Sequence, residues 1–207
     1  MTYLLVAFLA VAVAPLLVAT WRTSLVGLAL QGLLLTAIFL QRGWPTTASG
    51  AVLLVDLLLL RTVFVPRHLY RILRRQNVPR RNDVIPANMI SWTVAAALVY
   101  AGFRFSERVV PGGGEEAMHV AVVAAALLLA FLVLATQRRT FGLVVGVLRL
   151  ENAIALFELG AAETLPLPVQ LGVTGVLLLT VLTFGSFVTR MRAEPADVAG
   201  AAPRQAP

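Results

Sequence analysis

The chain contains no cysteine and no lysine. Without cysteine it cannot form disulfides, bind a metal through thiolates or ligate an iron–sulfur cluster. All 17 basic residues are arginine, whose guanidinium stays protonated in proteins, so proton transfer is left to carboxylates, histidine and water. The two histidines, His68 and His119, are too few for a conventional zinc site. The sequence therefore predicts no bound metal and no cofactor.

Charge is also scarce in this chain. Charged residues make up 13% of the 207 residues and hydrophobic residues 59%. Soluble domains average about 25% charged and about 45–50% apolar residues. The apolar residues are spread from end to end, which predicts an all-α, polytopic membrane protein. Neither a P-loop nor a dinucleotide-binding fingerprint is present.

The apolar runs have the length of membrane-spanning helices. Such a helix needs roughly 20 residues, with a range of about 17–25. We divide the chain into a three-helix part with a basic loop (1–84), a fourth helix and its loop (85–116), a second three-helix part (117–192) and a disordered tail (193–207). Seven spans are predicted, at about 3–20, 24–41, 48–66, 85–105, 117–136, 140–160 and 168–189.

Arginines are distributed unevenly over the predicted connections. With the N-terminus outside, twelve arginines fall on the cytoplasmic side and three, Arg42, Arg104 and Arg108, on the opposite side. Cytoplasmic loops carry the excess of basic residues in membrane proteins. We therefore expect the N-terminus outside and the C-terminus inside.

The connection "RHLYRILRRQNVPRRND" after the third predicted span is strongly basic. In a soluble protein it would favour nucleic-acid binding, but in a membrane protein it marks the cytoplasmic side and meets anionic lipid. We expect contact with the lipid bilayer and no nucleic-acid partner. Docking of an acidic soluble protein is compatible with the same loop.

A few ionisable residues lie inside the predicted spans. Each costs about 2.5–3.5 kcal/mol near the bilayer centre on insertion scales, so such residues persist where they are paired or where ions move. They are Asp56 and Arg61 in the third span, and Arg149, Glu151 and Glu158 in the sixth.

The stretch "GVLRLENAIALFELG" places two carboxylates on one helix face. Glu151 and Glu158 are seven residues apart, with Ala155 between them. Arg149 lies two residues from Glu151, about 200° around the helix axis, and points elsewhere. The face of Glu151 and Glu158 is therefore an acidic stripe.

Two interpretations of these charges stay open. In the first, each charge is half of an ion pair between helices, and Arg149 with Asp56 is the match in depth. In the second, Glu151 carries protons along a hydrated path, with Glu158 as an outer relay and Asp56 as a further candidate. Arg149 and Arg61 then have a structural or electrostatic role, because arginine does not release its proton.

Two stretches, taken in order, resemble hydrogenase-4 component E, a membrane subunit of formate hydrogenlyase-type complexes. The first is "RTVFVPRHLYRILRRQNVPR", and the second is "QRRTFGLVVGVLRLENAIALF", with its glycine and its Glu-Asn pair. The resemblance covers most of the chain. It implies other membrane subunits of a group 4 membrane-bound hydrogenase as partners, antiporter-like subunits among them.

The part 117–192 is also similar to NuoK, a three-helix subunit of respiratory complex I. The NuoK pattern G-x-E-x-x-x-N aligns on Gly146 and Asn152, and Leu148 stands where that subunit has its glutamate. Glu151 is three residues further on, roughly one turn along nearly the same face. The last predicted span contains no carboxylate, whereas NuoK-type subunits carry a second one there.

The resemblance implies a non-catalytic subunit of a complex-I-like oxidoreductase in a bacterial or archaeal cytoplasmic (inner) membrane. Such a subunit links antiporter-like subunits and contributes to proton or ion translocation coupled to electron transfer. The alternatives are a self-contained small transporter or antiporter, and a purely structural membrane anchor. The sequence has no evident internal repeat or pair of broken helices to support the transporter.

Overall fold

The computed structural model describes residues 1–17, 20–76, 89–137, 140–160 and 165–191. Helices α3, η1 and α4 follow one another without a break, so the described residues form seven helical rods, as predicted. The elements are α1 (Thr2–Leu17), α2 (Trp21–Leu40), α3 (Ala48–Val55), η1 (Asp56–Phe64), α4 (Val65–Gln76), α5 (Met89–Val109), α6 (Gly114–Thr136), α7 (Thr140–Glu158) and α8 (Leu167–Met191).

Several rods are long and apolar enough to cross a membrane, so the chain is a multi-pass membrane protein by helix length and hydropathy. The apolar stretch of α1, Thr2–Ala14, is shorter than a full span. The predicted span at 85–105 begins outside the described residues, and its described part lies in α5. Within the described part of the chain, five rods meet both criteria: Trp21–Leu40, Ala48–Arg74, Gly114–Thr136, Thr140–Glu158 and Leu167–Phe187.

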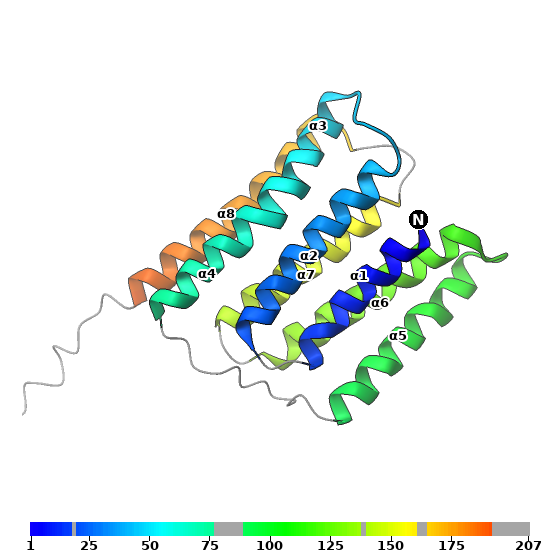
Figure 1. The fold of residues 1–207 in the computed structure, drawn as a ribbon, viewed down its shortest axis with the longest axis horizontal. Helices are drawn as coiled ribbons and strands as arrows, with labels where there is room; N and C mark the ends of the chain where they lie inside the picture. The colour runs from blue at the N-terminus through cyan, green and yellow to red at the C-terminus, as the bar shows by residue number, and fades with distance from the viewer. Residues whose placement is uncertain (18–19, 77–88, 138–139, 161–164, 192–207) are drawn as a thin grey trace, which may run out of the picture.

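Successive rods run in opposite directions along the bundle (Figure 1). One end holds the chain's first residue, the connection between α2 and α3, the start of α6 and the start of α8 (Figure 1). We call this end the N-terminal end of the bundle. The last turns of α4 and α8 lie at the other end (Figure 1). The predicted disordered tail, 193–207, and the arginines at 80, 81, 138, 139, 192 and 204 lie outside the described residues.

Local sequence signals determine where several helices begin. Thr20 and Thr47 are the N-caps of α2 and α3, and each side-chain oxygen accepts a hydrogen bond from the backbone N–H three residues on, at 3.3 Å and 3.1 Å. Before α6 the run Gly112 to Gly114 has φ values of +114°, +73° and +91°. Only glycine adopts this left-handed backbone without strain, so the run makes a tight turn.

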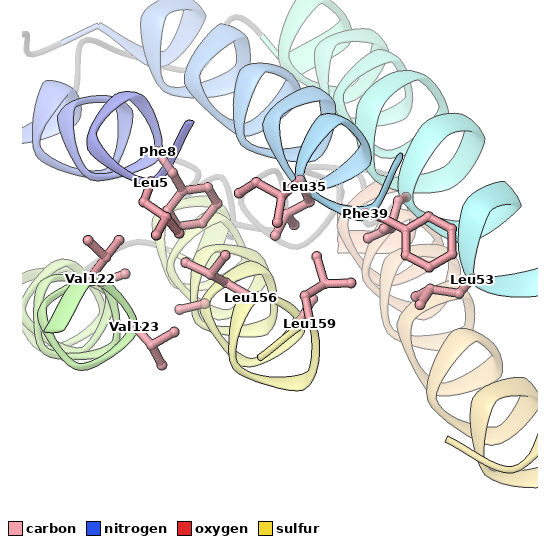
Figure 2. Close-up of a cluster of buried hydrophobic side chains, with 14 residues drawn as sticks. Leu5, Phe8, Leu35, Phe39, Leu53, Val122, Val123, Leu156 and Leu159 are labelled. Atoms are coloured by element: carbon pink, nitrogen blue, oxygen red, sulfur yellow. The ribbon is translucent and has the colours of Figure 1, made fainter. Parts of the chain in front are cut away.

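Helix α7 lies in the middle of the packed core. Figure 2 shows one apolar cluster, in which Leu156 of α7 and Leu159, just after its last turn, meet Leu5 of α1 and Leu35 of α2. In a second cluster, Val145 and Leu148 of α7 join side chains of α2, α4 and α8. Because α7 belongs to both clusters, a polar side chain on this helix is enclosed by neighbouring helices unless it points to the bundle surface.

Candidate functional site

The third rod changes its hydrogen bonding at its centre. Residues 56 to 64 form a π-helix, η1, and this run was not predicted from the sequence. The hydroxyl of Thr62 donates to the carbonyl oxygen of Leu57 at 2.8 Å, and the N–H of Val65 bonds to the carbonyl of Leu60. Pro66, the second residue of α4, has no N–H to donate, so one backbone hydrogen bond is missing there. Val65 alone separates the π-helix from this proline.

The π-helix brings Asp56 and Arg61 together. Residues five apart are separated by about 140° around the axis of an α-helix, whereas i→i+5 bonding aligns them on neighbouring turns. The Nε of Arg61 lies 2.8 Å from Oδ2 of Asp56, and the two residues are 4% and 1% exposed. The rod thus carries an ion pair inside the bundle.

The same guanidinium reaches across to α7. Its Nη1 donates to the Oδ1 of Asn152 at 3.0 Å, and Asn152 is buried. We call Asp56, Arg61 and Asn152 the central polar cluster. The cluster joins the third rod to α7 by charge-assisted hydrogen bonds, which are stronger than neutral ones.

A glycine on α2 allows η1 to come close. A Cβ at Gly32 would lie 2.8 Å from the Thr62 hydroxyl and 2.9 Å from backbone atoms of Arg61 and Thr62. Backbone atoms cannot swing aside as a side-chain end can. Gly32 is therefore part of the packing that holds the central polar cluster in place.

The predicted pairing of Arg149 with Asp56 is wrong. Asp56 is paired with Arg61, and the buried Arg149 donates to the carbonyl oxygens of Ala12 and Ser24, each at 3.4 Å. That pairing was suggested by depth in the membrane alone, and in an α-helix Asp56 and Arg61 would point apart. In the π-helix the two side chains meet, so Asp56 has its partner in its own rod.

The acidic stripe of α7 lies close enough to this cluster to interact with it. Glu151 and Glu158 are half-buried and both interact electrostatically with Arg61 and Asp56. The buried Oε2 of Glu151 has no hydrogen-bond partner among the described residues. Four of the five predicted residues, Asp56, Arg61, Glu151 and Glu158, are therefore brought into electrostatic range, while Arg149 contacts α1 and α2.

Sequence reasoning missed the role of Asn152. Its position directly after Glu151 was noted only as part of a motif. The signal that could have identified it is a polar amide buried in an apolar helix, since such groups require partners. Gln31 and Gln170, each 2% exposed, carry the same signal.

The arrangement offers one fixed positive charge and two carboxylates that can titrate. Within the described residues no group of three or more His, Asp or Glu side chains is placed to hold a metal ion. Arg61 supplies a fixed positive charge, while Glu151 and Glu158 are groups that can gain and lose protons. Comparisons with protein-family models, with curated proteins and with solved structures give no significant match to this chain.

Proposed function

We propose that this chain is a membrane-arm subunit of a complex-I-like assembly, such as a group 4 membrane-bound hydrogenase. It links antiporter-like subunits and contributes to proton translocation coupled to electron transfer. The observation that carries the proposal is the central polar cluster, enclosed among membrane-spanning helices with Glu151 beside it. The type of assembly is proposed from the sequence resemblance to hydrogenase-4 component E and NuoK. The membrane is the cytoplasmic membrane of a bacterium or archaeon.

Each residue has a distinct role in this proposal. Arg61 does not release its proton, so it acts by its charge and favours the ionised form of a nearby carboxylate. Glu151 is the proton carrier, because its carboxylate lies near Arg61 and has an unpartnered oxygen. Glu158 is seven residues away, about 10 Å along the axis of α7. A proton passing between them therefore needs water or a moving side chain.

The pairing of Arg61 with Asp56 favours a second candidate function, that of a structural membrane anchor. A buried guanidinium that is paired within its own rod and bonded to Asn152 of α7 can serve only to fix how the two helices meet. The two candidates differ at Glu151, which an anchor does not need as a titrating group.

Affinity purification of the tagged chain in mild detergent tests the assembly. Mass spectrometry of the eluate is expected to find antiporter-like membrane subunits together with a soluble electron-transfer module. Recovery of the chain alone, or with subunits unrelated to electron transfer, contradicts the proposal.

Glu151→Gln separates the proton carrier from the anchor. The glutamine keeps size and hydrogen bonding but cannot titrate, so the complex is expected to assemble and to lose proton-coupled activity. Glu158→Gln is expected to do less harm, and Glu107→Gln, at an exposed position, none. If the Glu151→Gln complex assembles and translocates protons like the wild type, Glu151 is not a proton carrier and the structural anchor is the better description.

Reporter fusions test the proposed orientation. A reporter fused after Arg192 is expected to read cytoplasmic, and one inserted in the turn from Gly112 to Gly114 is expected to read external. Reversed signals contradict the arginine distribution on which the orientation rests.

A further inference from the structure

Two hollows lie at the N-terminal end of the bundle. The first, of about 550 Å³, lies among residues of α2, α3, α7 and α8 and of the connections beside them. The second, of about 530 Å³, is lined by Met1 and by residues from α6 and α7. Arg42, Glu158 and Leu165 line both of them. The half-buried Glu158 therefore stands where the two hollows meet.

Both hollows are roomy and polar enough to hold water. Either volume far exceeds the roughly 10–15 Å³ that one water needs, and a water also needs two to four polar partners. The first hollow offers Thr46, Thr47 and Gln170 besides Arg42 and Glu158. The second offers polar side chains at Arg42, Glu115, Glu116, His119 and Glu158.

The walls of the second hollow are held by specific contacts. The amino group of Met1 lies 3.5 Å from the carboxylate of Glu115, and the Nε2 of His119 lies 2.9 Å from the carbonyl oxygen of Leu156. Gly160 leaves room for the His119 ring, because a Cβ on residue 160 would lie only 2.7 Å from the Nε2 of His119. His119 thus fastens α6 to the end of α7 beside Glu158.

Apolar side chains bound the first hollow on other sides. Phe39, Leu53 and Leu159 line it and also belong to the buried cluster of Figure 2. Glu151 lines neither hollow. Water that fills this space therefore reaches Glu158 and meets packed hydrocarbon before the central polar cluster.

We propose that the two hollows form one water-filled vestibule through which protons from the N-terminal side of the membrane reach Glu158. The role of these protons rests on the proposed function, whereas the presence of water in the vestibule does not depend on it. The charges that face it are those of Glu115, Glu116 and Glu158, with Arg42, His119 and the amino terminus of Met1 opposite. Glu158 is the innermost carboxylate that bulk water contacts.

The absence of cysteine makes the vestibule directly testable, since any introduced thiol is the only one in the chain. Glu158→Cys and Leu165→Cys place a thiol in the vestibule. Ile154→Cys is the matched control on α7, because Ile154 is 43% exposed on the surface of a membrane-spanning rod and lines neither hollow. Glu107→Cys is the control for an exposed position in the last turn of α5, a helix that ends at the N-terminal end of the bundle (Figure 1).

Labelling uses a charged, membrane-impermeant thiol reagent on sealed vesicles of each orientation, with the chain in its native membrane. Glu158→Cys and Leu165→Cys are expected to react at least about tenfold faster than Ile154→Cys, because apolar surroundings disfavour the reactive thiolate and exclude a charged reagent. They are expected to react from the same side as Glu107→Cys.

Two results overturn the vestibule. One is that both vestibule variants react as slowly as Ile154→Cys while Glu107→Cys reacts. The other is that they react only from the opposite side. Leu165→Cys leaves Glu158 intact, so misfolding of the Glu158 variant does not remove the test. Labelling is read without proton translocation, so failure of the proposed function and failure of the vestibule are separate results.

Discussion

Among the residues that the structure describes, two buried arginines lie in membrane-spanning rods, and they are held in different ways. Arg61 is bound by side chains, the carboxylate of Asp56 at 2.8 Å and the amide of Asn152 at 3.0 Å. The hydrogen bonds from Arg149 to Ala12 and Ser24 are 3.4 Å long and end on backbone carbonyls of α1 and α2. A charge held by side chains depends on residues that a substitution can remove. A charge held by carbonyl oxygens has acceptors that no substitution removes.

The difference also concerns what each arginine can do. Arg61 lies within electrostatic range of Glu151 and Glu158, so a change at Asp56 alters the field at both carboxylates. Arg149 joins α7 to the first two helices. We therefore assign an electrostatic role to Arg61 and a packing role to Arg149, and the following substitutions test that contrast.

Removing the carboxylate of Asp56 is expected to have the largest effect. Asp56→Ala leaves the buried Arg61 without its counter-charge, and breaking a buried pair in this way costs about 3–5 kcal/mol. The unfolding free energy measured by SDS titration in mixed micelles should fall by that amount. Glu107→Ala removes an exposed carboxylate and should leave the free energy nearly unchanged.

Asn152→Leu is expected to cost less, because the ion pair remains. It removes one acceptor from a buried guanidinium, and hydrogen bonds to charged groups contribute about 1.5–3 kcal/mol. The same SDS titration measures this loss. If the unfolding free energy falls no further than it does in a surface variant such as Glu107→Ala, Asn152 is not part of the central polar cluster.

Gly32→Ala tests the approach of α2 to η1. The added Cβ meets the backbone of Arg61 and Thr62, so overpacking by about 1–3 kcal/mol is expected. Gly175→Ala on α8 is the matched control, since its Cβ meets open space. Equal thermal stability of the two variants in detergent contradicts the close packing.

Gly27→Ala is expected to have the smallest effect. Its Cβ would lie 3.0 Å from the Nη2 of Arg149, which is the end of a flexible side chain and can shift. Alanine is also the better helix former by up to about 1 kcal/mol, so the net change should stay within that amount. A loss as large as that of Gly32→Ala indicates that Arg149 is held as rigidly as η1.

Part of this molecule follows from its sequence. The length of the apolar runs predicted helical rods, and the spacing of Glu151, Ala155 and Glu158 predicted a shared face of α7. The scarcity of charge made the few ionisable residues in the spans stand out as a candidate site. These features depend on hydrophobic periodicity and charge count, which can be read directly from the sequence.

The π-helix could not be predicted in the same way. Periodicity at 3.6 residues per turn treats Asp56 and Arg61 as pointing apart, and no residue type specifies i→i+5 bonding. The segment depends on contacts distant in sequence, such as Gly32 on α2 and Asn152 on α7. The wrong partner for Asp56 followed from this, because depth in the membrane alone pointed to Arg149.

A double-mutant cycle on Asp56 and Arg61 tests the central polar cluster most directly. Asp56→Ala, Arg61→Met and the double variant are compared with the wild type by SDS titration, and Asp56→Ala with Arg149→Met forms the parallel cycle. The account predicts that the first double variant is milder than the sum of its single losses by about 1–3 kcal/mol, and that the second cycle couples more weakly. Additivity within about 0.5 kcal/mol in the first cycle, or stronger coupling in the second, contradicts it.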